Sequence, residues 1–225
     1  MQHYQRRTDS KTRTNYGYTL AVGLREFPET RDLAPALEAM NERLDEAANA
    51  TAALVRPITK AQATIRFAAY HANSTVRSLH GASKIADGGR AGPITAGLFP
   101  HGLGPELRAK GSALAVPVAA ILERLVLGSA PGVDAVRTEW RPKLESALAR
   151  LSSSIAAYDE VKRQHDAAFA RECAARDEHV RAIDVVMGQV RAAFPRDREK
   201  QDSIFPRRMS RSRTQATPPS STTAA

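Results

Sequence analysis

The sequence predicts an all-α fold: an elongated antiparallel bundle of long, heptad-patterned helices with disordered termini. The first observation behind this prediction is the stretch from Leu33 to Leu79, where apolar or small residues recur at alternating spacings of four and three. Such spacing is typical of a long helix lying along a partner, as in a coiled coil. The second is composition, since 42% of residues are hydrophobic, only 5% are aromatic and 40 are Ala. Small side chains favour close helix packing over a sheet core.

The first long helix is expected over residues 32–86. Asp32 suits the N-cap position, because its carboxylate can accept hydrogen bonds from the first helical N–H groups. Pro57 lies inside the heptad pattern, where a missing donor and a ring clash cost about 3 kcal/mol in a regular helix. Because the pattern continues through Leu54 and Ile58 without a shift, we expect a kink at Pro57 rather than two separate helices.

A loop rich in Gly and Pro is expected over residues 87–112. Loops longer than about 12–15 residues are uncommon inside a compact body, and this one carries Leu98, Phe99 and Leu103 as apolar anchors. We therefore expect it to fold back onto one end of the bundle. Its glycines do not match a phosphate-binding loop, because the Lys-Ser/Thr pair is missing. A shorter helix follows over residues 113–128.

The last helical region is expected over residues 133–194, with an apolar stripe that includes Trp140, Leu144 and Phe169. Ser152, Ser153 and Ser154 leave two interpretations open. If the helix continues through them, it forms a long antiparallel pair with the first helix, and the bundle has three helices. If it ends there, the arrangement is a four-helix bundle. We favour the continuous helix, because serine alone is a weak stop signal.

The excess positive charge lies mainly at the two ends of the chain. The net charge is +9, of which residues 1–31 supply +3 (six Lys/Arg, three Asp/Glu) and residues 196–225 supply +4 (seven against three). The sequence thus predicts a helical domain over 32–195 between a basic flexible arm at 1–31 and a basic disordered tail at 196–225. The commonest role of such a tail is to keep the protein in solution without a specific partner. The alternatives are sequence-independent phosphate contacts, contact with an anionic membrane surface, and modification of Ser210. The candidate residues for phosphate contacts are Arg6, Arg7, Arg207, Arg208, Arg211 and Arg213.

Four of the six Phe residues are followed by Pro at or outside an expected helix end, Phe27 and the three candidate plugs Phe99, Phe194 and Phe205. Proline cannot continue a helix, and an aromatic ring beside it can cover the open end of a core. We predict that these three rings act as plugs at bundle ends. A docking motif for a partner is the alternative.

Candidate catalytic and metal-binding patterns are weak. His165, Glu172 and His179 are spaced by seven, which places neighbouring members about 10 Å apart along a helix, too far for one metal ion. We expect Glu172 and His179 on a solvated face. No Gly-x-Ser-x-Gly elbow occurs, and adjacent acids such as Asp159 and Glu160 point to different sides of a helix. We therefore predict no catalytic residues, no metal site and no cofactor.

The sequence favours a non-enzymatic structural or protein-interaction scaffold. A protein partner or self-association is expected, because an Ala-rich seam buries little apolar area per turn. The alternative is a nucleic-acid-associated protein whose basic terminal tails make sequence-independent phosphate contacts. The first residues lack the apolar core of a secretory signal, and no run of about 18 apolar residues exists, so we expect a cytoplasmic protein without a membrane span.

Overall fold

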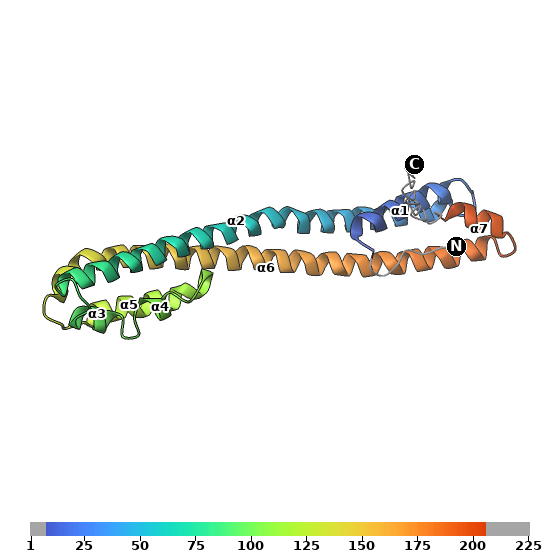
Figure 1. Cartoon of the computed structure of the whole chain (residues 1–225). Coiled ribbons are helices and arrows are strands. Elements are labelled where there is room, and N and C mark those ends of the chain that lie inside the picture. Colours follow the sequence, from blue (N-terminus) through green and yellow to red (C-terminus); the bar gives the residue numbers. More distant parts are fainter. Residues whose placement is uncertain (1–7, 206–225) are drawn as a thin grey trace, which may run out of the picture. The chain divides into compact units, whose positions relative to one another are not determined.

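The computed structural model describes residues 8–205, and these residues form helices without strands (Figure 1). In chain order the α-helices are α1 (Ser10–Arg25), α2 (Ala34–Ala86), α3 (Pro93–Leu98), α4 (Leu103–Glu106), α5 (Ala115–Leu127), α6 (Val133–Ala193) and α7 (Arg198–Ile204). Short 3-10 turns, Arg31–Leu33 and Gly111–Leu114, precede α2 and α5. The two long helices, α2 and α6, pack antiparallel, which confirms the predicted fold class.

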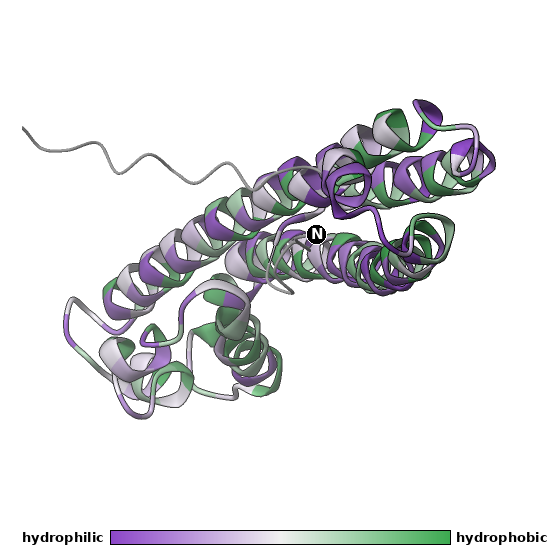
Figure 2. Cartoon of the chain, turned by 90° about the vertical axis from the view of Figure 1, so that its right-hand side faces the viewer, coloured by the Kyte–Doolittle hydropathy of each residue, from purple (hydrophilic) through white to green (hydrophobic). Residues whose placement is uncertain are grey.

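Both long helices continue without interruption through the prolines and serines that could have ended them. Pro57 lies inside α2 and Pro142 lies inside α6. The serines at 152–154 are helical, so α6 does not end there. Of the two interpretations left open by the sequence, the continuous helix paired with the first long helix is the correct one. Ser154 Oγ donates a hydrogen bond to the Arg150 carbonyl, one turn earlier (2.8 Å). A buried serine can satisfy its hydroxyl within the helix in this way. Figure 2 shows hydrophilic and hydrophobic residues alternating along both helices.

The chain divides into two compact units, which we describe separately. Among the described residues, the first contains 8–48 and 172–205, and the second contains 49–171. In the first unit, α1 and α7 pack with the adjoining parts of α2 and α6 around a core of Leu20, Leu24, Leu37, Ile183 and Val190. Each of these five side chains is at most 1% exposed. This core is apolar and well buried.

The first unit corrects the predicted boundaries of both ends. Residues 10–25, expected in a flexible arm, form α1, whose N-cap Asp9 accepts a hydrogen bond from the Thr12 backbone (2.9 Å). Residues 198–204, expected in a disordered tail, form α7, and Ile204 at its end is 1% exposed. The apolar residues of these short helices complete a core that α2 and α6 would otherwise leave open to water.

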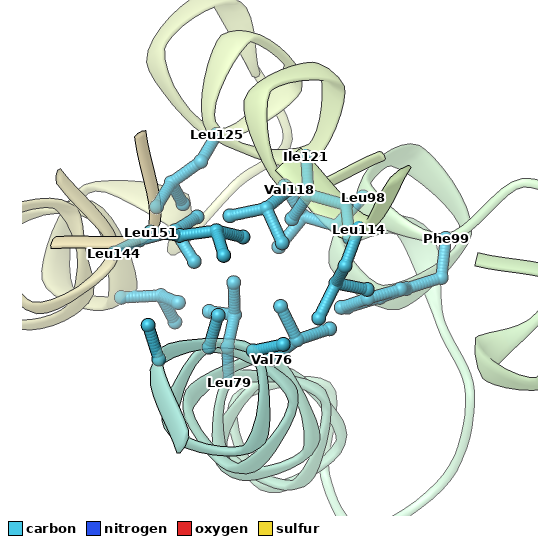
Figure 3. Close-up of a cluster of buried hydrophobic side chains, with 14 of the residues drawn as sticks. Val76, Leu79, Leu98, Phe99, Leu114, Val118, Ile121, Leu125, Leu144 and Leu151 are labelled. Carbon is cyan, nitrogen blue, oxygen red and sulfur yellow. The ribbon is translucent and has the colours of Figure 1, made fainter. Parts of the chain in front are cut away.

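The second unit has a larger core, in which α5 packs with α2 and α6. Figure 3 shows Val76 and Leu79 from α2, Leu144 and Leu151 from α6, and residues of α5 pointing toward one another. The expected loop at 87–112 is partly helical, since it contains α3 and α4. Leu98 and Phe99 are 2% and 3% exposed in this core, so the loop does pack onto the helices.

Asp87 explains how that loop begins. Its carboxylate accepts hydrogen bonds from the backbone N–H groups of Gly92 (3.1 Å), Ile94 (3.1 Å) and Thr95 (2.8 Å), and from the Thr95 hydroxyl (2.7 Å). These donors include the first N–H groups of α3, which have no partner inside the helix. Burial raises the pKa of Asp87, but the hydrogen bonds from Thr95, Ile94 and Gly92 outweigh it and lower the pKa below its usual value.

Candidate functional site

The predicted phosphate-contact residues fall outside the part of the chain that the structure describes. They are Arg6, Arg7, Arg207, Arg208, Arg211 and Arg213. The three predicted plug residues lie inside it: Phe99, Phe194 and Phe205 are 3%, 5% and 3% exposed. The Phe194 ring meets the Phe27 ring edge-on, with centroids 5.5 Å apart, and the Phe99 ring meets His80 at 4.9 Å. All three rings therefore belong to cores.

A buried polar cluster in the first unit joins α1 to α6. Ser10 Oγ donates to Glu172 Oε1 (2.6 Å), and Arg176 donates to both, through Nε to Ser10 (2.7 Å) and through Nη2 to Glu172 (2.5 Å). Ser10 and Glu172 are 4% and 5% exposed. Arg13, also 4% exposed, donates to the carbonyl of Arg176 (3.1 Å). These polar groups bind one another, so the cluster positions helices rather than facing a ligand.

A second buried polar contact joins α2 to α6 in the same unit. His179 Nε2 lies 2.8 Å from Asn41 Oδ1, and both residues are fully buried. Because an amide oxygen only accepts, the hydrogen bond requires the proton on Nε2. The prediction that Glu172 and His179 face solvent is therefore wrong. The reason is the packing of other helices, since Ser10 of α1 contacts Glu172 and Asn41 of α2 contacts His179.

No metal site emerges from the residues that the sequence put forward. His165 is 27% exposed in its side chain and contacts Asp166, while Glu172 and His179 take part in different polar contacts. Within residues 8–205 no group of three His, Cys, Asp or Glu side chains is placed to hold a metal ion. In the same range, no helix is both long and apolar enough to cross a membrane.

The second unit contains an open, largely apolar cavity of about 620 Å³ beside α3 and α5. Its apolar walls include Ile94, Leu98, Leu127 and Val133. The charged residues at its edge are Glu123 and Arg124, and Arg124 is already engaged, because its Nη1 donates to Glu106 Oε1 (2.7 Å). The lining shows no nucleophile beside a base, which is what an acyl- or phosphoryl-transfer site needs.

The surface with the most distinctive chemistry is the outward face of α2 in the second unit. Arg56, Lys60, Phe67, Tyr70 and Arg77 follow one another at spacings of four, seven, three and seven, which keeps them on one side of a helix. This side is opposite the one that carries Ile65, Ala68, Ala72 and Leu79 into the core. Arg66 flanks Phe67. We call these six residues, Arg56, Lys60, Arg66, Phe67, Tyr70 and Arg77, the α2 basic face, and all six are exposed.

The rings of the α2 basic face are uncovered. Phe67 is 55% exposed and Tyr70 is 68% exposed. The Arg66 guanidinium lies 5.3 Å from the centroid of the Phe67 ring, and His71 meets Tyr70 edge-on with ring centroids 5.6 Å apart. An exposed aromatic ring next to a guanidinium presents two flat groups on which another flat group can stack.

In the described part of the chain, the cations of the α2 basic face are not paired with acids, whereas most cations on the neighbouring part of α6 are. Residues 49–86 carry five Lys/Arg and no Asp or Glu, and none of the five pairs with a carboxylate among residues 8–205. The second-unit part of α6, residues 133–171, carries seven Lys/Arg and six Asp/Glu. Five of those seven cations form ion pairs within the helix: Arg137, Arg141, Lys143, Lys162 and Arg163. Within the described residues, this part of α2 thus carries unpaired cations without any carboxylate, whereas most cations on the second-unit part of α6 are compensated by a neighbouring acid.

The α2 basic face was not predicted, because most of the net positive charge lies at the two ends of the chain. The signal is nevertheless present in the sequence, since no acid occurs between Glu46 and Asp87. What the sequence alone cannot supply is exposure: Phe67 and Tyr70 would equally suit a core. Comparison with protein-family models, with curated proteins and with solved structures gave no match.

Proposed function

We propose that this chain is a non-enzymatic helical scaffold that binds a macromolecular partner through the α2 basic face. The observation that carries the proposal is the pairing of uncompensated cations with two exposed rings on a helix that is otherwise anchored in a core. Large exposed aromatic residues are enriched at interaction sites. The buried polar groups of the first unit support a scaffold role, because they form hydrogen bonds between helices.

The test places a photo-crosslinking amino acid at one position of the full-length protein in its native cells. Position 70 lies on the α2 basic face, and position 169 is a matched control, because Phe169 is also an exposed aromatic of the second unit (46%) but lies on α6. We expect light-dependent adducts of higher mass from position 70 and none from position 169. Equal adducts from both positions, or none from either, would overturn the proposal.

Two expectations from the sequence stay predictions. Self-association predicts a mass above that of one chain in light scattering at micromolar concentration, and a monomer mass would exclude it. Nucleic-acid association through the terminal tails concerns arginines outside the described residues. It predicts that removing residues 206–225 weakens binding and leaves the helical content unchanged.

A further inference from the structure

We propose that the α2 basic face is a binding surface for single-stranded nucleic acid, with phosphates contacted by its four cations and bases stacked on Phe67 and Tyr70. This inference rests on the proposed function and names the partner that the face would take. It is independent of the tails, because every residue involved belongs to a well-packed helix of the second unit.

The cations of the α2 basic face are spaced along the helix and are not paired with acids within residues 8–205. From Arg56 to Arg77 the face extends roughly 31 Å along the helix, with four cations distributed over that length. Because no carboxylate lies on residues 49–86, a polyanion meets no repulsive charge from this part of α2. A row of separated cations suits a partner whose charges also repeat along a line, such as a phosphate backbone.

Two exposed aromatic rings lie between the cations of the α2 basic face. Proteins that bind single strands without reading their sequence combine a basic track with aromatic side chains on which bases stack. Phe67 and Tyr70 occupy the middle of the track, with Lys60 on one side and Arg77 on the other. Bases inside a duplex present no open faces, so this arrangement favours a single strand over double-stranded DNA or RNA.

An anionic membrane is a weaker match to the same residues. Helices that lie in a membrane surface bury a continuous apolar face. Here the positions between the rings and Arg77 are polar, as at Ser74, and the position before Phe67 on this face is Ala63. Two rings on a basic polar surface suit stacking better than insertion among acyl chains.

The charge test uses fluorescence anisotropy of a labelled oligouridine of about 20 nucleotides titrated with full-length protein over a range of salt concentrations. One variant removes the four cations (R56Q/K60Q/R66Q/R77Q). A matched control removes four paired cations from the second-unit part of α6 (R141Q/K143Q/K162Q/R163Q), which changes the net charge equally. Circular dichroism checks that both variants stay helical.

We expect the face variant to bind at least tenfold more weakly and the control to stay within about twofold of the original protein. The slope of log K against log salt should fall by about 2.8 in the face variant, since each lost phosphate contact on a single strand contributes about 0.7. Equal losses in the two variants, or no binding by the original protein at low salt, would overturn the inference.

The ring test separates stacking from charge. Phe67→Ala and Tyr70→Ala should each weaken binding about fivefold or more without changing the salt slope, because a stacked base is worth at least about 1 kcal/mol. Tyr70→Phe keeps the ring and should bind like the original protein, as should the control Phe169→Ala. If the Ala variants bind normally, or if a duplex or vesicles of phosphatidylserine bind as tightly as the single strand, the inference is wrong.

The crosslinked adducts distinguish failure of this inference from failure of the proposed function. Adducts from position 70 that collapse on nuclease treatment support both. If the extra mass of the adducts resists nuclease and is lost only after protease treatment, the partner is a protein. That result supports the scaffold proposal and overturns the inference of a nucleic-acid partner. The absence of adducts overturns the scaffold proposal itself.

Discussion

Asn41 of α2 occupies the space that a side chain at Gly17 of α1 would need. A Cβ added at residue 17 would stand 1.9 Å from Asn41 Oδ1, whereas atoms in contact keep well beyond 3 Å. Asn41 has no room to retreat, because it is fully buried and the same oxygen lies 2.8 Å from His179 Nε2. The absence of a side chain at residue 17 therefore lets α1 approach the buried Asn41–His179 contact.

Gly17→Ala should destabilise the first unit by about 1–3 kcal/mol, because the overpacked methyl group forces α1 away or breaks the Asn41–His179 contact. Urea unfolding followed by circular dichroism measures the change. Gly188→Ala is the matched control, since Gly188 lies in α6 of the same unit and a Cβ there meets nothing within 4 Å. That control should be neutral or more stable, as Ala favours helix. Equal stability of the two variants would contradict the predicted clash.

The Asn41–His179 hydrogen bond should appear as coupling in a double-mutant cycle. Asn41→Ala and His179→Ala each remove a buried hydrogen-bonding group, and we expect a coupling free energy of unfolding of about 0.5–1.5 kcal/mol between them. The measurement is urea unfolding of the two single variants and the double variant. Strictly additive losses would mean that the two side chains contribute independently.

Two leucines of α5 test how this helix packs in the core of the second unit. Leu125 is fully buried, whereas Leu127, two residues later, is 73% exposed. Leu125→Ala should cost about 2–5 kcal/mol of unfolding free energy through lost burial and the cavity left behind. Leu127→Ala should stay within about 0.5 kcal/mol of the original protein. Chemical denaturation of both variants gives the comparison, and a similar cost for each would contradict the placement of α5.

Asp87 should make the second unit sensitive to acid. Its pKa is lowered in the folded protein, so its contribution to stability is complete above the unfolded value of 3.8 and is lost as the pH falls through the lower folded pKa. Asp87→Asn should therefore lower the melting temperature at neutral pH, and the difference should shrink in strong acid, where the original Asp87 is protonated too.

Thermal unfolding at several pH values measures this effect. Asp159→Asn serves as the control, because Asp159 is exposed on α6 and lies far along the chain from the α3 start. A melting difference for Asp87→Asn that stays constant down to strong acid would show that the hydrogen bonds to the carboxylate do not depend on its charge.

The buried polar residues explain why α1 escaped prediction. Its buried positions follow a helical spacing, at residues 10, 13, 14, 17, 20, 21 and 24. The first four are Ser, Arg, Thr and Gly, so the stripe has no apolar period in its first half and resembles a solvated segment. Glu172 and His179 were misplaced for a related reason, since each is buried against a polar partner from another helix, Ser10 of α1 for Glu172 and Asn41 of α2 for His179.

The sequence by itself predicted the two long helical regions and the loop that returns to the core, and it favoured a long antiparallel pair over a four-helix bundle. Helix formation depends on the spacing of apolar residues and on helix breakers that are close in sequence, so it can be predicted from the sequence alone. This held even at Pro57 and at the serines 152–154, through which the helices continue. Tertiary structure decided which polar groups are buried and which aromatic rings stay exposed. Asn41 and His179 are buried against each other, with Gly17 of α1 close to Asn41, and Phe67 and Tyr70 are exposed because α5 packs on the opposite side of α2. Burial depends on the neighbours supplied by distant parts of the chain, which local spacing does not record.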